Sequence, residues 1–482
     1  MHNLDISGIL YFFANLKPNS LALVDDSNEL TFSQLDTNVR RIARLLQING
    51  IDASSLVCTM LPSFLDWQVT LALHILGASS FSKPVGSKLD SALVPQWLIS
   101  TQLNSDFPED QTFIVDENFE KAVNQTDRLK SAPGFPSLDF PARYFFTSGT
   151  SGAAKYLVIS AEELLAKVKY QGSSELVGES DVLNLLQFGA TQSYRIALRA
   201  LNEGRTFYTC GFFDYRLSKI LNKYPIRTVA GSPVQVSSMI DSLVQTGTKV
   251  PNVGTIIMGG SAPTQIQINR IREHLDVKIY NSYGSTELGF VSMHEIVNGR
   301  IDGGNIWPEV RLEIVDEKNN KVPNGEIGII RYAKRKMPKS YFNSEEASNE
   351  YFQDDFFYPG DLGYLNEFGQ LHISGRTNDV INLGGVKISP EKVEEIAFRS
   401  SGVADAAAFP VIDDNGVKRL ALAYVKDVGF DLKDLETRIE REFLAISVAK
   451  YVEVMEIPRN ENGKIPRSKL AEIIFSPEVK ND

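Results

Sequence analysis

The sequence predicts an α/β fold with a large N-terminal domain of helix-covered sheets and a β-rich subdomain, followed by a small α+β C-terminal domain. Strand and helix signals alternate from residue 182 to 280, a pattern typical of parallel sheets covered by helices. Shorter strands separated by turn signals follow, from Asp302 to about Gly375, and the pattern resets at Asp379. We therefore expect a large domain at 1–375, a boundary segment at 376–380 and a small domain at 381–482.

Length and composition narrow the class of protein. The chain of 482 residues is too long for one ordinary core, and its 43% hydrophobic and 23% charged residues are near globular averages. The formal net charge of -11 argues against broad nucleic-acid binding, which depends on Lys and Arg. Cys58 and Cys210 are too few for a disulfide framework and fit a reducing compartment. With no signal-peptide pattern and no run of membrane-span length, the sequence predicts a cytoplasmic protein.

The first elements alternate between strand and helix. A helix is expected from Thr31 to Asn49, because its first residue forms a capping box with Gln34 and apolar residues recur at helical spacing. A buried strand at Leu56–Leu61 and a helix at Asp66–Leu76 follow. The polar, proline-rich segment Asp106–Pro141 has no strong period and is expected to be a surface connection.

The stretch Phe145–Lys155, FFTSGTSGAAK, is expected to be a loop between two strands. Its glycines let backbone N–H groups turn toward an anion, its hydroxyls can donate hydrogen bonds, and its lysine supplies a positive charge. A phosphate-binding loop and a flexible Gly/Ser linker are both consistent with this composition. The loop differs from the P-loop of NTPases, in which glycine and lysine are adjacent before a hydroxyl residue.

Ser160 and Glu163 form another capping box, which predicts a helix to about Tyr170. Further strands are expected at 182–187, 206–208, 228–230, 255–258 and 278–280, and helices at 195–201, 217–222, 233–243 and 263–274. Ligands of such sheets lie beyond the carboxyl ends of the strands. Turns predicted at such ends, 259–261 and 283–286, could therefore converge with the loop at Phe145–Lys155.

Three motifs after residue 280 carry polar chemistry. NSYGSTE, at 281–287, offers an aromatic ring that can stack on a base and a carboxylate of the kind that Mg²⁺ accepts. YPGDLG, at 358–363, and SGRTND, at 374–379, flank a short strand signal. An aspartate can accept hydrogen bonds from a ribose diol, and an arginine can bind ribose or phosphate oxygens. Taken singly, each motif is equally consistent with an ordinary turn.

The C-terminal unit is expected to contain helices at 390–399, with Ser389 as N-cap, and 432–443, and strands near 406–411, 420–425 and 452–457. Lys464 follows in an Asn-Gly turn, where a solvated lysine is the ordinary outcome. The five histidines lack metal-ligand spacing and no GxSxG motif occurs, which argues against zinc and serine-hydrolase chemistry. The run Ala333–Lys339 is the one dense basic patch in the sequence.

Taken in order, these stretches resemble the AMP-forming adenylating enzymes, a superfamily of acyl- and aryl-CoA synthetases, peptide-synthetase adenylation domains and firefly luciferase. TSGTSGAAK is similar to the family's phosphate loop, NSYGSTE to its adenine and magnesium motif, and YPGDLG to its ribose-aspartate motif. SGRTNDVINLGGVKISPEKVE is similar to the hinge segment, and ENGK to the catalytic-lysine motif. The five motifs occur in the family's order, and the resemblance covers nearly the whole chain.

The resemblance implies a role for each matching residue. The adenylation step would be served by Lys464, Thr286 and Glu287, with Glu287 also the ligand of Mg²⁺. The residues implied to bind ATP are Thr147, Ser148, Gly149, Thr150, Ser151 and Lys155 at its phosphates, Gly259, Gly260, Ser261, Asn281, Ser282 and Tyr283 around the adenine and acyl pocket, and Asp361 and Arg376 at its ribose. The small α+β C-terminal domain, 381–482, would be mobile on a hinge at 376–380 that includes Asp379. Gly384 and Gly385 would line the thiol channel.

The implied activity is ATP-dependent activation of a carboxylic acid as acyl-AMP with release of pyrophosphate, then transfer to the thiol of coenzyme A. A carboxylate is already ionised at neutral pH, so its attack needs no catalytic histidine or cysteine. The stretch Gln187–Arg195 lacks the aspartate that holds an amino group in peptide synthetases, which favours a non-amino acid. Arg195 or Arg199 is either a contact for an anionic substrate or a surface residue of a helix.

Two alternatives remain open at this point. The acyl group could pass to the phosphopantetheine of an acyl carrier protein, which would then be a partner. The chain could also be a nucleotide-binding scaffold without turnover, although the retained Lys464, Glu287 and Asp361 favour an enzyme. The motifs organise the nucleotide and do not identify the acid.

Overall fold

The computed structural model describes residues 6–89, 91–148, 154–169, 181–211, 215–250, 252–297, 304–335, 337–383, 386–412, 417–442, 448–459 and 465–475. The expected site residues outside this set are Gly149, Thr150, Ser151, Gly384, Gly385 and Lys464. Within the described ranges, no helix is both long and apolar enough to cross a membrane.

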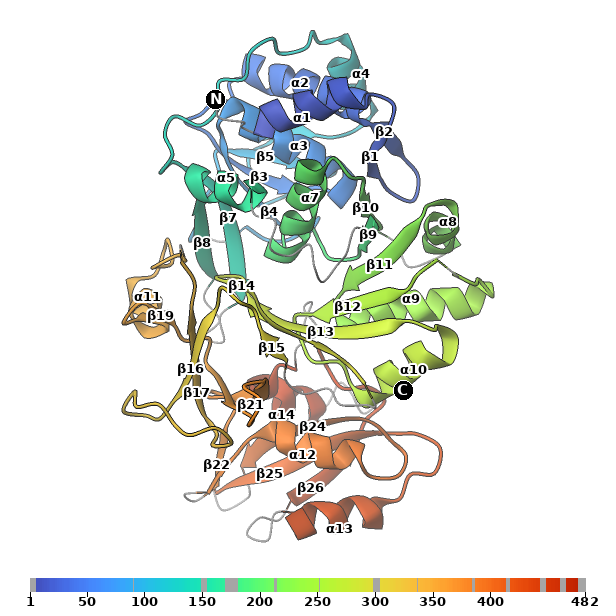
Figure 1. Ribbon diagram of the computed structural model, residues 1–482, viewed down its shortest axis with the longest axis vertical. Coiled ribbons are helices and arrows are strands. Elements are labelled where there is room, and N and C mark those ends of the chain that lie inside the picture. The colour runs from blue at the N-terminus through green and yellow to red at the C-terminus, as the bar shows by residue number, and fades with distance from the viewer. Residues whose placement is uncertain are drawn as a thin grey trace.

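The N-terminal part contains a six-stranded sheet of order β6-β5-β3-β4-β7-β8 (Figure 1). Its strands are β3 (Leu56–Met60), β4 (Ser79–Ser82), β5 (Trp97–Ser100), β6 (Thr112–Ile114), β7 (Pro141–Ser148) and β8 (Ala154–Ser160). The helices of this part are α1 (Ile6–Leu16), α2 (Phe32–Ile48), α3 (Ser63–Leu76), α4 (Glu117–Gln125) and α5 (Ala161–Lys169). Neighbouring strands are parallel except β7 and β8, which form an antiparallel pair on either side of the predicted phosphate loop.

The predicted helix at Thr31–Asn49 is confirmed as α2. The side chain of Thr31 accepts a hydrogen bond from the backbone N–H of Gln34, and the Gln34 side chain accepts one from the backbone N–H of Thr31. The segment Asp106–Pro141 lies mostly at the surface, as predicted, but the prediction missed its 3₁₀ turn η1 (Glu109–Gln111), strand β6 and helix α4. A three-residue strand is too short to show alternation, and α4 buries only Val123, so neither leaves a clear pattern.

The second sheet has nine strands in the order β15-β14-β13-β12-β11-β9-β10-β1-β2. They are β1 (Leu21–Val24), β2 (Glu29–Thr31), β9 (Asp181–Asn184), β10 (Phe207–Thr209), β11 (Ile226–Gly231), β12 (Thr255–Gly259), β13 (Lys278–Ser285), β14 (Gly289–Glu295) and β15 (Asn305–Ile306). The helices are α7 (Thr191–Glu203), α8 (Tyr215–Lys223), α9 (Pro233–Thr246) and α10 (Gln265–His274). Neighbouring strands from β9 to β13 are parallel, which confirms the predicted alternation.

One detail of this sheet differs from the prediction. The turn expected at 283–286 begins later, because β13 continues to Ser285 and pairs antiparallel with β14. The register shifts between Tyr283 and Gly284, so the strand carries an irregularity there. The antiparallel partner supplies hydrogen bonds beyond the point where the parallel neighbour β12 ends, and this lengthens β13.

The β-rich subdomain is a six-stranded sheet in which β18-β19-β17-β20-β21 are consecutive and β16 also pairs with β17. Its elements are β16 (Arg311–Val315), β17 (Gly328–Ala333), α11 (Glu345–Tyr351), β18 (Phe352–Gln353), β19 (Phe356–Phe357), β20 (Asp361–Leu365) and β21 (Leu371–Arg376). All its strand pairs are antiparallel, as expected for short strands joined by turns.

The C-terminal unit lies at the foot of the molecule in Figure 1. It comprises a hairpin, β22 (Ile381–Leu383) and β23 (Val386–Ile388), and a sheet of β24 (Val403–Ile412), β25 (Lys418–Lys426) and β26 (Val448–Glu453). Its helices are α12 (Pro390–Phe398), α13 (Leu432–Glu442) and α14 (Arg467–Phe475). The predicted α/β class with a smaller α+β unit is confirmed, although β26 begins and ends earlier than the strand expected at 452–457.

Candidate active site

Asp361, the predicted ribose ligand, is held from two sides. It is the first residue of β20, opposite Arg376, the last residue of β21, and the Arg376 Nε lies 3.1 Å from its Oδ1. The Tyr283 hydroxyl donates a hydrogen bond of 2.5 Å to its Oδ2. Asp361 is only 5% exposed. These contacts fix the carboxylate between the nine-stranded sheet and the β-rich subdomain, and they bring three predicted site residues together.

The same contacts set the ionisation of the group. Burial and the Asp361 carboxylate raise the pKa of Tyr283 well above its usual value, so its hydroxyl keeps its proton and remains a donor. Burial lowers the pKa of Arg376, but the combined charges of Asp361, Asp379 and neighbouring tyrosines outweigh burial and raise the pKa of the guanidinium overall. The arrangement therefore holds a carboxylate between two fixed donors, and a carboxylate has about four acceptor positions, enough to accept also from a sugar diol.

Glu287 lies in the turn between β13 and β14, and a second contact fixes its direction. The Tyr341 hydroxyl donates a hydrogen bond of 2.6 Å to Glu287 Oε1. Lys155, on β8, is near this pair, with its Nζ 4.1 Å from the ring centroid of Tyr351 and 5.7 Å from that of Tyr341. Because Lys155 and Glu287 approach the same tyrosine, β8 and the β13–β14 turn meet at one place.

The turn after β12 meets the same strand. Gly259 ends β12, and a Cβ there would lie 2.5 Å from Ser282 Oγ and 3.3 Å from the Gln192 side-chain oxygen. Ser282 Oγ in turn donates to the Met258 carbonyl oxygen at 3.0 Å. Gly260 has φ of 91°, a conformation that favours glycine, and Ser261 follows it. The turn at 259–261 therefore packs closely against β13 and the start of α7.

The remaining predicted residues occupy compatible positions. Asn281 lies on β13 beside Ser282 and Tyr283, and Thr286 precedes Glu287 in the turn. Thr147 and Ser148 end β7, and Thr147 Oγ1 lies 3.5 Å from the Lys155 carbonyl oxygen. The loop between Ser148, which ends β7, and Ala154, which begins β8, falls outside the described residues.

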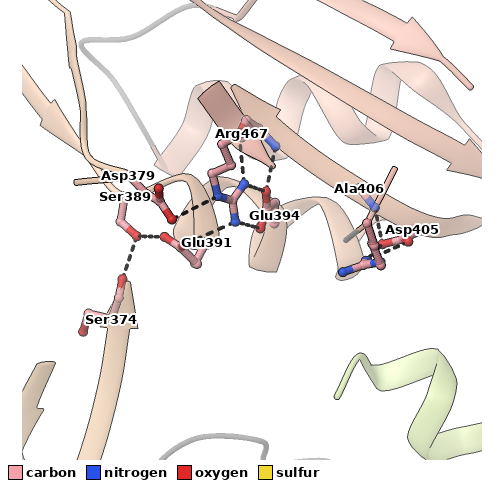
Figure 2. A network of polar contacts seen from close by, with 10 residues as sticks. Ser374, Asp379, Ser389, Glu391, Glu394, Asp405, Ala406 and Arg467 are labelled. Carbon is pink, nitrogen blue, oxygen red and sulfur yellow. Dashed lines mark hydrogen bonds and ion pairs between the residues drawn. The ribbon is translucent and has the colours of Figure 1, made fainter. Parts of the chain in front are cut away.

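The predicted hinge residue Asp379 contacts the C-terminal unit through Arg467, the first residue of α14 (Figure 2). Arg467 Nε lies 3.7 Å from Asp379 Oδ2, and its Nη2 lies 3.2 Å from Glu391 Oε1. The guanidinium also pairs with Glu394. Burial raises the pKa of Asp379, while Arg467 works in the opposite direction. The start of α14, three residues after Lys464, is therefore tied to the predicted hinge residue Asp379.

Ser389 differs in detail from its predicted role as N-cap of α12. It occupies the cap position, but its side chain makes no capping hydrogen bond. Its hydroxyl instead lies 2.6 Å from the Ser374 carbonyl oxygen and 2.6 Å from Glu391 Oε2. The side chain thus links β21 to α12, across the boundary expected at 376–380.

These residues fit a Mg-nucleotide. Asp361 with Arg376 suits a ribose, and Glu287 supplies one carboxylate oxygen donor. Within the described part of the chain, no group of three or more His, Cys, Asp or Glu could hold a metal alone. Mg²⁺ is commonly held by one or two carboxylates together with substrate phosphates, so a single glutamate is compatible with it.

Sequence reasoning missed Tyr341, Tyr351 and Gln192. Each of them is far from its partner along the chain; Tyr341 is 54 residues from Glu287. An isolated tyrosine or glutamine has no local pattern that separates a site residue from an ordinary one. Only the tertiary contacts identify these side chains as parts of the site.

Comparisons with known proteins agree with this geometry. The model of the family described as "AMP-binding enzyme" matches residues 12–342. A 4-chlorobenzoate–CoA ligase of an Arthrobacter species is 24% identical over 502 residues, covering 96% of this chain and 94% of the ligase. A fatty acid–[acyl-carrier-protein] ligase of Mycobacterium marinum is 26% identical over 514 residues, covering 95% of each chain.

Solved structures show the same fold. An o-succinylbenzoate–CoA synthetase of Bacillus subtilis, solved with the acyl-adenylate OSB-AMP, superimposes with a TM-score of 0.78 at 20% identity, covering 96% of this chain and 97% of the synthetase. The predicted resemblance is thereby confirmed. Because the family model spans more than half of the sequence, the chain belongs to the AMP-binding enzyme family.

Proposed function

We propose that this protein is an AMP-forming acid–thiol ligase, which activates a non-amino carboxylic acid with ATP and transfers the acyl group to coenzyme A. The observation that carries the proposal is the contact of Asp361 with both Tyr283 and Arg376. It joins three motifs, the first of them far from the other two in the sequence, into one group suited to a nucleotide. Matches to CoA ligases over nearly the full length of both chains support the acid–thiol chemistry.

The described residues would divide the binding of ATP among them. Asp361 and Arg376 would hold the ribose, and Tyr283 would stack on the adenine while its hydroxyl stays on Asp361. Lys155 would meet the outer phosphates, leaving the aromatic ring of Tyr351 when they arrive. Mg²⁺, held by Glu287 and phosphate oxygens, would neutralise part of the phosphate charge.

The first step would be an in-line displacement. A carboxylate oxygen attacks the α-phosphorus, the bond to pyrophosphate breaks, and pyrophosphate leaves with the electron pair. Two anions must approach for this to happen, and positively charged side chains lower the barrier by stabilising the charge. From the family motif we assign this role to Lys464, with Thr286 at the α-phosphate.

The second step would follow rotation of the C-terminal domain about Asp379. The thiol of coenzyme A, having lost its proton, attacks the carbonyl carbon of the adenylate, and AMP leaves. Gly384 and Gly385 would line the path of the pantetheine arm, because glycine allows close approach to the backbone. The contacts of Asp379 and Ser389 with neighbouring segments support a hinge in this region.

Transfer to an acyl carrier protein is the second candidate. The Mycobacterium marinum relative, named for carrier-protein transfer, favours it. A cytoplasmic location is proposed as well, supported by the two buried free cysteines, Cys58 and Cys210.

The test is acid-dependent exchange of labelled pyrophosphate into ATP, measured over a panel of aryl, short-chain and long-chain acids. At least one acid class should support exchange, and thioester should then form with coenzyme A. Folded protein that binds ATP but shows no exchange with any acid would indicate the non-catalytic scaffold. Faster transfer to a loaded carrier protein than to coenzyme A would select the second candidate.

A further inference from the structure

Arg195 brings a positive charge to the neighbourhood of the predicted acyl pocket. It lies on α7, three residues after Gln192, whose side-chain oxygen faces Gly259. Residues three apart share one face of a helix, so both side chains point toward the ends of β12 and β13. The guanidinium lies against Gly289, where a Cβ would overlap Nη1. Gly289 has φ of 76°, a conformation that favours glycine. Because glycine has no Cβ, there is room beside it for the Arg195 guanidinium.

Arg195 lacks a partner in the described part of the chain. Its Nε is buried and makes no hydrogen bond, and neither an ion pair nor a hydrogen bond of its terminal nitrogens occurs among the described residues. Burial lowers the pKa of Arg195 to about 10, which leaves it charged at neutral pH. A desolvated cation without a partner is costly, and an anion that joins it removes that cost.

Lys334 adds a second positive charge at the same hairpin. Its Nζ donates a hydrogen bond of 2.7 Å to the carbonyl oxygen of Phe290, the residue after Gly289. Burial, together with repulsion from Arg195, lowers the pKa of Lys334 to about 8, so the two cations are near enough to interact. Among the described residues, Glu309 is the only carboxylate whose charge affects the pKa of Lys334. Glu309 can therefore balance one of the two positive charges of Lys334 and Arg195, and the other remains without a counter-charge.

The distance from Arg195 to the proposed reaction centre limits the length of the substrate. Gly289 lies two residues after Glu287, and two residues of chain span at most about 7 Å. We propose that Arg195 binds a second carboxylate of the acid substrate, which makes the substrate a short aliphatic or aromatic dicarboxylic acid. This inference rests on the proposed function and names its substrate class. The reacting carboxylate stays free to attack, while the second carboxylate of the substrate pairs with the Arg195 guanidinium.

The experiment compares matched acids in the pyrophosphate exchange assay. Succinate, glutarate, adipate and phthalate are each paired with their half-amide, which has the same skeleton and lacks the second charge. For the diacid of best length, kcat/KM should exceed that of its half-amide by about 10- to 100-fold, the range of one charged hydrogen-bonded contact.

Variants assign that preference to the arginine. Arg195→Met should remove the preference while leaving KM for ATP unchanged, and Arg195→Lys should retain part of it. Arg199→Met is the matched control, because Arg199 lies one turn further along α7 and pairs with Glu203 at 2.8 Å. The control should keep the wild-type ratio.

Each outcome separates this inference from the proposed function. If wild-type enzyme uses half-amides as well as diacids, or if Arg195→Met slows both by the same factor, the second-carboxylate role is wrong and the ligase function stands. If no acid supports exchange in protein that binds ATP, the function fails and this inference fails with it. The wild-type comparison decides the question without relying on the folding of any variant.

Discussion

At the scale of single residues, Asp361 is the side chain on which the proposed nucleotide site most depends. It is buried, and it receives a hydrogen bond from Tyr283 and an ion pair from Arg376. A carboxylate in this position is already oriented before a ligand arrives, so little ordering is needed on binding. The aspartate was identified from the sequence, but its partner on β13 became evident only in the structure.

Asp361→Asn should weaken nucleotide binding. The substitution keeps the size of the side chain and removes its charge, and hydrogen bonds to charged groups contribute about 1.5–3 kcal/mol. We expect Kd for AMP and KM for ATP to rise about 10- to 100-fold. Calorimetric titration with AMP measures the first, and Asp316→Asn, in an exposed turn, is the control. Unchanged AMP affinity in a folded variant would remove Asp361 from the site.

His74 gives the N-terminal part a dependence on pH. It is buried, its Nε2 lies 2.7 Å from the Tyr194 hydroxyl, and burial together with Arg143 lowers its pKa from 6.5 to about 3. The unfolded chain takes up a proton below pH 6.5 that the folded protein excludes. Stability from neutral His74 is therefore complete above that pH and is lost as pH falls toward 3.

We expect the free energy of unfolding to fall by at most about 1.4 kcal/mol per pH unit from this group. His74→Gln keeps a hydrogen-bonding side chain and should flatten the dependence between pH 6 and about 4. Urea unfolding at several pH values measures the slope, and His274→Gln, on the exposed surface, is the control. Equal slopes in all three proteins would show that His74 is not responsible.

At the scale of elements, the β13–β14 hairpin joins the parts of the site. It carries Tyr283 toward Asp361, and its turn carries Glu287 toward Tyr341. The hairpin needs glycine at 284, because a Cβ there would overlap the Gly289 carbonyl oxygen. A rigid backbone contact of this kind cannot be relieved by rotating a side chain.

Gly284→Ala should therefore push the two strands apart. Overpacking of this kind costs about 1–3 kcal/mol, and we expect AMP binding to weaken together with stability, since Tyr283 precedes the distorted residue. Urea unfolding and AMP titration measure the two effects. Gly254→Ala is the matched control, because a Cβ at Gly254 meets nothing within 4 Å. A stable variant with normal AMP affinity would show that the hairpin tolerates separation.

The elements themselves were largely predictable, because their signals are local. The capping boxes at Thr31 and Ser160 and the alternation from 182 to 280 were confirmed in place. The missed elements have a physical reason: β6 is three residues long, and the extension of β13 depends on its antiparallel partner. Local pattern does not encode which strands pair.

The same limit applies to the site. Motifs with turn chemistry indicated Asp361, Arg376 and Glu287, whereas contacts such as Tyr341 with Glu287 and Arg195 with Gly289 join distant segments. Arg195 illustrates this well, since the sequence left it open between a surface residue and an anion contact. The surroundings of Arg195 follow from the packing of α7 on the β13–β14 hairpin.

At the scale of the whole molecule, the C-terminal unit has its own buried clusters, around Val393 and Leu422 and around Phe409. Arg467, on α14, pairs with Glu394 of α12 and lies near the predicted hinge residue Asp379, and Ser389 also links α12 to β21 (Figure 2). A separate core for each domain is what rotation of one domain against another requires.

Arg467→Met should destabilise the C-terminal unit alone. Removing one partner of a buried ion pair costs about 3–5 kcal/mol, because Glu394 would be left without its cation. Hydrogen exchange should accelerate in α12 and β24 and stay unchanged in β12 and β13. Arg438→Met, which breaks an exposed pair with Asp434, is the control. Equal acceleration in both regions would contradict a domain boundary at 376–380.

The central claim, that an acid is activated as an acyl adenylate, is tested most directly by following oxygen. In the proposed reaction the carboxylate oxygen that attacks the α-phosphorus remains on AMP when the thiol takes the acyl group. An acid labelled with ¹⁸O in its carboxylate should therefore yield AMP that carries one labelled oxygen, detected by mass spectrometry after complete turnover with coenzyme A. Unlabelled AMP, or label recovered in inorganic phosphate beside ADP, would contradict the account.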